Sequence, residues 1–173
     1  MTTAERTAAD QAIAILEATP STLQAMLGAL PPELAQAPGE DGGWSAIDVL
    51  GHLVSAEEPA LRARIQTILD SDDAEIVNVD GPAVLEELRS RGLSLSGLLA
   101  AFADERARTL TVFRSLRDDQ LGRTGRHSAL GPLSVLNVLS HFAFHDLQHT
   151  AQIATAIGRS TYAGRGKLAG VGD

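Results

Sequence analysis

The sequence of 173 residues contains no cysteine. Disulfide bonds, thiolate ligands to a metal and a cysteine nucleophile are therefore excluded, because each of them requires the sulfur of this residue. If a thiol takes part in the chemistry of this protein, a cofactor must bring it.

Aromatic residues are scarce, at 3% of the chain. The core must therefore be built from leucine, alanine, valine and isoleucine, which suits closely packed helices. A chain of this length is large enough to bury a core without disulfides. We expect one domain over residues 1–173, with its core in residues 8–158 and a tail over residues 159–173.

Basic residues are outnumbered, with 14 Lys and Arg against 22 Asp and Glu and a formal net charge of −8. Nucleic acid is not expected as a partner, because its binding depends largely on neutralising phosphates. No run reaches the roughly 18 consecutive apolar residues that a membrane span needs, and residues 1–6 lack the apolar core of a signal peptide. We therefore expect a cytoplasmic protein with no membrane partner.

Apolar residues recur at helical spacing over four long stretches, approximately residues 8–30, 44–69, 95–117 and 133–158. Within the first stretch, Pro20 indicates either a kink or the first position of a further helix. Ser45 is the expected N-cap of the second helix, and Trp44 is expected to anchor its packing. Four long helices with longer connections predict an all-α four-helix bundle, in which facing helices supply a site.

The connections contain segments that imitate motifs. Residues 70–75 hold several carboxylates but lack the spacing and glycine of a calcium loop, which predicts a solvated acidic connection. The glycine-rich segment 164–170 follows a helix and no strand, so we interpret it as a mobile tail and not as a nucleotide-binding loop. A short helix is expected at residues 82–91 and an extended piece at 76–79. Residues 118–132 predict a loop, from which His127 could still act as a lid or contact a substrate.

The last long helix carries three of the five histidines, His141, His145 and His149, at positions i, i+4 and i+8. On an α-helix these residues share one face, which we expect to point towards the core. Each neutral imidazole has one donor and one acceptor to satisfy, and an unsatisfied buried polar group costs about 1–3 kcal/mol. Packing alone therefore explains such a row poorly, whereas a metal ion would satisfy the lone pairs directly.

One ion can take at most two of these three residues, because His141 and His149 are separated by about 12 Å of helical rise. Histidines at i and i+4 can share an ion, but the spacing does not say which neighbouring pair does so. Catalytic zinc sites usually have three protein ligands and one open position. His52, in the second long helix, is the best candidate for the third ligand.

These motifs together resemble a known family. A Trp-Ser pair that opens a helix, the His-Leu pair at His52, and a final His-x-x-x-His-x-x-x-His followed by Gln-Ile are similar to the DinB/YfiT-like superfamily of metal-binding four-helix bundles. The resemblance extends from the first helix to Ile157 and implies that His52, His145 and His149 bind a divalent metal. It departs at residues 150–151, Thr-Ala, where many members have Arg-Gly.

Three neutral imidazoles suit zinc or nickel and leave coordination positions open. An anion is favoured there, and it could be hydroxide or a thiolate. The first would give a hydrolase of a small-molecule substrate. The second would give an S-transferase that activates a low-molecular-weight thiol, as the resemblance to thiol-dependent members implies. A non-enzymatic bundle that binds a metal or a small ligand is the alternative.

Two further residues are candidates near the ligands. His141 could be a general base or a partner of the ligands, or a hydrogen-bonded core histidine. Glu57 could be a carboxylate beside the ligands or could form a salt bridge with Arg64. The exposed apolar surface of such a bundle, and the dimers of many relatives, lead us to expect a homodimer.

Overall fold

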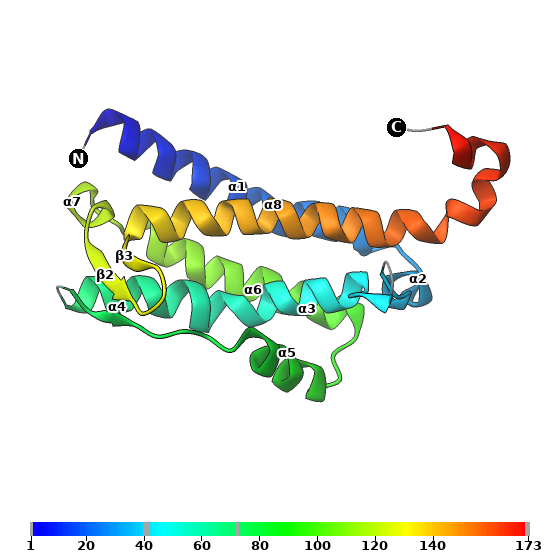
Figure 1. Ribbon diagram of the computed structural model, residues 1–173, viewed down its shortest axis with the longest axis horizontal. Coiled ribbons are helices and arrows are strands. Elements are labelled where there is room, and N and C mark those ends of the chain that lie inside the picture. Colours follow the sequence, from blue (N-terminus) through cyan, green and yellow to red (C-terminus); the bar gives the residue numbers. More distant parts are fainter. Residues whose placement is uncertain (1, 40–41, 72, 172–173) are drawn as a thin grey trace.

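The computed structural model describes residues 2–39, 42–71 and 73–171. Its four longest helical rods lie side by side and confirm the predicted four-helix bundle (Figure 1). These are α1 (Thr3–Leu27), a composite rod of α3 (Ala46–Ala56), η2 (Glu57–Arg62) and α4 (Ala63–Asp70), α6 (Leu95–Arg114), and α8 (Val135–Ser160). Among the described residues, no helix is both long and apolar enough to cross a membrane.

Each rod packs against two neighbours, because α1 contacts α6 and α8 while α3 contacts the same two helices. The colours of Figure 1 show that α3 and α8 run in opposite directions. The long connection between α4 and α6 contains the predicted short helix, α5 (Gly81–Ser90). The bundle therefore places a position late in α8 beside a position early in α3.

Buried apolar side chains form two clusters, one in each half of the bundle. The first includes Leu16, Leu61, Leu110 and Phe142, and the second includes Leu23, Leu53, Phe102 and Ile153. The rods contribute buried polar residues between these clusters, namely Thr19, Glu57, Arg106, Thr109 and Asp146. A polar layer thus crosses the middle of an otherwise apolar core.

Arg106 is the centre of this layer. Its Nε donates to Glu57 Oε1 at 2.8 Å, and its Nη1 donates to Asp146 Oδ2 at 2.6 Å. The three side chains are only 1–2% exposed. A buried charge is tolerated when it is paired and hydrogen-bonded, and here one guanidinium joins α3–η2, α6 and α8.

Helix α1 continues through Pro20, so a new helix does not begin there and that alternative is wrong. Proline has no N–H, and the carbonyl four residues earlier, that of Leu16, loses its usual helical donor. Arg106 Nη1 donates to this carbonyl at 2.8 Å. The buried arginine therefore satisfies the acceptor that Pro20 leaves free.

The composite rod begins as predicted, because Ser45 caps α3. Its Oγ accepts a hydrogen bond from the N–H of Asp48, whose carboxylate accepts one from the N–H of Ser45. Further along, Glu57–Arg62 forms a π-helical turn that contains Pro59. The N–H of Ala63 reaches back five residues to the carbonyl of Glu58, which marks the wide turn.

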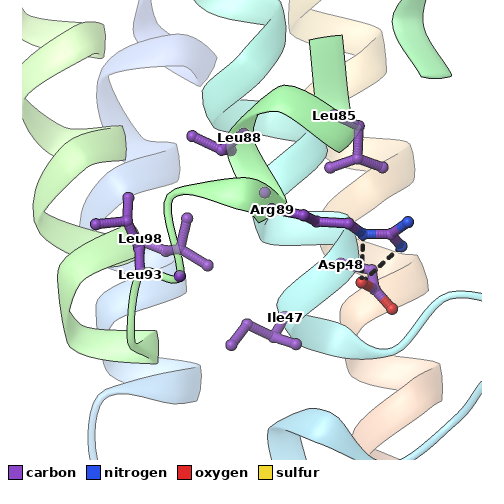
Figure 2. Close-up of a pocket in the computed structure, with 9 residues that line it drawn as sticks. Ile47, Asp48, Leu85, Leu88, Arg89, Leu93 and Leu98 are labelled. Carbon is purple, nitrogen blue, oxygen red and sulfur yellow. Dashed lines mark hydrogen bonds and ion pairs between the residues drawn. The ribbon is translucent and has the colours of Figure 1, made fainter. Parts of the chain in front are cut away.

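Helix α5 packs on α3 beside a small apolar pocket of about 130 Å³ (Figure 2). At its rim, Arg89 donates two hydrogen bonds to Asp48 Oδ1, at 3.2 and 2.7 Å. Gly51 allows the close approach, since a side chain there would contact Leu85 at 3.3 Å. This contact fixes the connection between α4 and α6 against the rod that carries His52.

The prediction of a loop over residues 118–132 is wrong. The segment contains α7 (Asp118–Leu121) and strand β2 (Thr124–His127), which pairs antiparallel with β3 (Gly131–Ser134). Strand β1 (Glu75–Ile76) adds in parallel to β2, so the extended piece predicted at 76–79 is shorter and starts earlier. His127 is buried, and its Nδ1 accepts hydrogen bonds from the backbone N–H groups of Ala129 and Leu130. It stabilises the turn of this hairpin.

The predicted acidic connection and tail fall partly outside the described residues, since residues 72, 172 and 173 are not among them. Asp73 forms an ion pair with Arg126 at 2.7 Å. The glycine-rich segment belongs to η3 (Tyr162–Gly170), whose 3₁₀ turns are interrupted by a kink at Gly166, where φ is 54° and ψ is −127°. Residues 118–134 and 162–170 are thus more regular than the sequence pattern predicts.

Candidate metal centre

Helices α3 and α8 bring His52, His145 and His149 together. One ring nitrogen from each of the three lies within 4.8 Å of those of the other two. The Nε2 atoms of His52 and His145 are 3.0 Å apart. No second group of three or more His, Asp or Glu side chains with this arrangement occurs in the described parts of the chain. The residues that the family resemblance selects are therefore neighbours in space, and metal binding by them stays a prediction.

The row of imidazoles points only partly towards the core, so the expectation of a core-facing row is wrong for His141. His145 and His149 are half-buried, and His141 is exposed. Phe142 and Asp146 take the core-facing positions of α8, and Asp146 is buried because it pairs with Arg106. The row of histidines lies along the edge of α8 that faces α3, where solvent and small molecules have access.

Hydrogen bonding leaves ring nitrogens available as ligands. His149 Nδ1 lies 2.8 Å from Gln152 Oε1, an acceptor, so Nδ1 carries the proton and Nε2 keeps its lone pair. The Nδ1 atoms of His52 and His145 are buried and have no hydrogen-bond partner among the residues described. Only the ring of His149 has the outer hydrogen bond that usually orients a metal-bound histidine.

Burial keeps two of the three imidazoles neutral. Desolvation and, to a smaller extent, the neighbouring His149 lower the pKa of His52 to about 4. Desolvation, together with smaller contributions from the three histidines around it and from Arg106, lowers the pKa of His145 to about 3. Both rings are therefore deprotonated at pH 7 and would bind a cation without first losing a proton. This donor set fits a borderline divalent ion.

Gln152→Leu is expected to weaken metal binding by roughly 10–100-fold, since it removes the acceptor that orients His149. Gln152 is exposed, so the fold should be unchanged. A zinc titration against a competing chelator measures the affinity. Gln148→Leu, at another exposed position of α8, is the matched control and should bind zinc as the parent does. Equal affinities of the parent and Gln152→Leu would contradict this role.

A cavity of about 180 Å³ adjoins the histidines. It is enclosed by the composite rod, the start of α5 and α8. Its lining residues are His52, Ser55, Ala56, Ala60, Arg64, Val79, Gly81, Val84, His141, Phe142 and His145. The cavity thus joins two of the candidate ligands to a mostly apolar space that is large enough for a small organic molecule.

His141 lines this cavity, and its ring centroid lies 6.0 Å from that of His145. Burial, together with the charge of Arg64, lowers its pKa. It is outside the group of three converging histidines. A role for His141 as a general base stays a prediction.

Glu57 does not pair with Arg64, so that alternative is wrong. Its carboxylate accepts hydrogen bonds from Arg106 and Thr109 and belongs to the polar layer. Glu57 lies four residues after the buried Leu53, on the face of the rod that points into the core. Trp44 is 36% exposed, and its ring lies 5.2 Å from that of His52. It therefore packs on a candidate ligand and not in the core.

Sequence reasoning missed the roles of three charged residues. Arg106 and Asp146 form the polar layer directly beneath the histidines, and Arg64 lines the cavity. A signal for the pair existed, because Asp146 is the only acidic residue in a long apolar helix. A buried acidic residue requires a cationic partner in the core. The sequence contains 14 Lys and Arg residues and does not show which of them is that partner.

Comparison with known proteins supports the resemblance to the DinB/YfiT-like superfamily. A family model described as the DinB superfamily matches residues 15–153. YfiT of Bacillus subtilis (strain 168), named as a proposed metal-dependent hydrolase, is 27% identical over 145 residues, which cover 83% of this chain and 81% of YfiT. GK0616 of Geobacillus kaustophilus (strain HTA426), named likewise, is 30% identical over 156 residues, with 83% and 80% covered.

Solved structures show the same fold. The structure of Bacillus subtilis YfiT, described as having an unusual four-helix bundle topology, gives a TM-score of 0.78 at 25% identity and covers 88% of this chain and 87% of its own. The four-helix bundle protein TT2238 gives a TM-score of 0.57 at 25% identity, with 84% and 98% covered. The bundle and its connectivity are therefore shared with proteins of this group.

Proposed function

Since the chain belongs to the DinB superfamily, we propose that it is a metal-dependent hydrolase of a small-molecule substrate. The observation that carries this proposal is the convergence of three imidazoles beside a cavity. Residues His52, His145 and His149 would hold the ion, with zinc or nickel best suited to three nitrogen ligands. The relatives named as proposed metal-dependent hydrolases support it.

The chemistry that such an ion supplies when bound is Lewis acidity and the activation of water near neutral pH. Three protein ligands leave room for water, whereas purely structural sites are usually closed by four. This difference favours an enzyme over a bundle in which the metal only stabilises the fold.

The protein's own residues would shape and position the substrate. Ala56, Ala60 and Val84 line the cavity beside the histidines with small apolar groups, which limit the size of the substrate. His141 lies on the same wall, one helical turn before His145, with a neutral ring at pH 7. We propose that it accepts a proton from the attacking water or positions that water.

The proposal predicts hydrolysis that depends on the loaded metal. Untagged protein is stripped with a chelator, reloaded with zinc or nickel, and assayed against a panel of small esters and amides. We expect hydrolysis by the loaded protein, loss of at least about 90% of the rate on chelation, and recovery on reloading. A rate that is unchanged by chelation in every assay would contradict the proposal.

A small thiol added to the same assays separates hydrolysis from thiol transfer. Mass spectrometry of the products distinguishes a hydrolysed substrate from a thiol conjugate. Conjugates that form only with the loaded protein would identify an S-transferase, in which the thiol comes from a cofactor since the chain has no cysteine.

The homodimer also stays a proposal. Phe144 and Leu147 are 57% and 53% exposed on α8 and offer an apolar surface for it. Apolar side chains that are exposed next to each other are common at protein interfaces. Two copies that pack along α8 would bury both residues.

A further inference from the structure

Arg64 stands out among the arginines of the chain. Its Nε is buried without a hydrogen-bond partner, and no described carboxylate forms an ion pair with it. Arg62, two residues earlier, pairs with Glu105 and also donates to Thr109. Because an arginine side chain in a protein keeps its proton, Arg64 brings an uncompensated positive charge to the cavity wall.

Desolvation lowers the pKa of Arg64, and no acidic neighbour counteracts this among the described residues. A partly buried charge without a partner reduces stability. Such a cost is typical of binding sites, where the partner is a ligand and not another side chain. An anion that enters the cavity would supply the partner that Arg64 lacks within the described residues.

The π-helical turn explains why Arg64 faces the same cavity as His52. Residues His52, Ala56, Ala60 and Arg64 follow one another at steps of four and all line it. In a regular α-helix each step of four drifts by about 40°, so three steps would rotate Arg64 well away from the face of His52. The wide turn between Glu57 and Arg62 compensates for this drift.

The two alanines between these residues leave the space open. All four of Arg64, His141, His52 and His145 line the cavity. The charge of Arg64 acts on His141, and the Nε2 atoms of His52 and His145 are 3.0 Å apart. The antiparallel course of α3 and α8 agrees with this, since Arg64 follows His52 on one rod while His141 precedes His145 on the other (Figure 1). A molecule in this cavity can contact the guanidinium and the histidines together.

We propose that this site takes a small organic carboxylate, whose anionic group pairs with Arg64 while its remaining atoms extend towards His52 and His145. The reaction at the histidines rests on the function proposed above, whereas the pairing with Arg64 does not. A carboxylate matches the planar fork of an arginine through two parallel hydrogen bonds.

Size and charge favour a carboxylate over a phosphate ester. A cavity of about 180 Å³ is smaller than the roughly 300–1,000 Å³ of drug-sized sites. A phosphate monoester carries a charge of about −1.5 to −2 at pH 7, and Arg64 is the one fixed cation among the residues that line this cavity. The apolar side chains of Val79, Val84 and Phe142 suit a short hydrocarbon chain next to the anionic group.

The test compares butyrate with butyramide, which has nearly the same shape and no charge, by isothermal titration calorimetry. The parent protein is titrated both loaded with zinc and free of metal. We expect butyrate to bind at least about tenfold more tightly than butyramide in both forms. Arg64→Met should abolish this preference, and Arg64→Lys should retain part of it. Arg108→Met, which removes an exposed arginine of α6, is the control for net charge and should keep the full preference.

The thermal midpoint gives a second measurement. Arg64→Met should unfold at the same temperature as the parent or higher, because it removes an unpaired charge and keeps a side chain of similar length. A midpoint several degrees lower would show that Arg64 has a partner within the fold and would overturn the proposal.

Three calorimetric results would also overturn it: no butyrate binding to the parent, equal binding of both probes, or a preference that persists in Arg64→Met. Tighter binding of butyl phosphate than of butyrate, dependent on Arg64, would reject the carboxylate. Failure to load either zinc or nickel would reject the metal-dependent hydrolase alone, since the metal-free titration still decides the role of Arg64.

Discussion

Replacing His145 by alanine is expected to weaken metal binding by at least about 100-fold while the helices stay folded. His145 is central to the site, with its Nε2 3.0 Å from that of His52 and its ring centroid 4.3 Å from that of His149. Loss of a residue that merely orients a ligand already reduces affinity by about 10–100-fold, so loss of a ligand should exceed this. The fold should survive, because His145 is only half-buried at the edge of α8.

Elemental analysis of untagged protein, together with a zinc titration against a chelator, measures this effect. The parent should bind about one ion per chain. His141→Ala is the matched control, because it removes the same side chain one turn away and outside the converging group. Equal loss of metal from both variants, or a full equivalent retained by His145→Ala, would show that the three-histidine site is assigned wrongly. Circular dichroism of each variant confirms that its helices remain.

The four rods and the row of histidines could be predicted from the sequence because both depend on local periodicity. Steps of four residues place His145 and His149 on one edge of a helix whatever the rest of the chain does. The spacing did not select this pair over His141 and His145, and the family resemblance did. His52 could be named from the sequence as the best candidate for the third ligand, but its position beside His145 depends on which rods are neighbours, and periodicity does not contain that information.

The hairpin of β2 and β3 could not be predicted in this way. Its first strand reads Thr124-Gly125-Arg126-His127, which lacks the apolar alternation of a typical strand. It forms because distant residues complete it, as Ile76 pairs with His127 in parallel. Gly125 allows the approach, since a side chain there would lie 2.9 Å from the carbonyl oxygen of Ala74.

Periodicity also could not predict which residues of the second rod share a face on the two sides of its π-helical turn. A regular helix from Ser45 to Asp70 would not place Arg64 on the face of His52. Pro59 was the local signal, since a proline within a long helical pattern indicates an irregular turn. The sequence alone does not show whether that turn is a kink, an end or a π-helical turn. The cavity wall of the candidate site depends on this difference.

Arg106→Met is expected to have the largest effect on stability, a loss of about 3–5 kcal/mol in the free energy of unfolding. The substitution leaves Glu57 and Asp146 buried without their cation and the Leu16 carbonyl without its donor. Urea denaturation followed by circular dichroism measures the loss. Arg114→Met, at an exposed position of α6 that pairs with Glu17, should change stability by less than about 1 kcal/mol.

The cause can be separated from simple loss of packing. If buried charge is responsible, neutralising the carboxylates as Glu57→Gln and Asp146→Asn in the Arg106→Met background should recover much of the loss, because replacing a whole buried ion cluster is tolerated better than breaking it. A triple variant no more stable than Arg106→Met would contradict this. Asp146 adjoins His145 in α8, so the layer also fixes the helix that carries two of the candidate ligands.

Pro20 provides the final test of the layer. Pro20→Ala restores a backbone N–H that can donate to the Leu16 carbonyl within α1. In the parent, Arg106 Nη1 donates to this carbonyl instead. The same change should therefore stabilise Arg106→Met more than it stabilises the parent, by about 1 kcal/mol, the contribution of one hydrogen bond. A double-mutant cycle measures this difference directly. Equal gains in both backgrounds would mean that the arginine does not replace the missing helical donor, and the Glu57 and Asp146 carboxylates alone would then account for its burial.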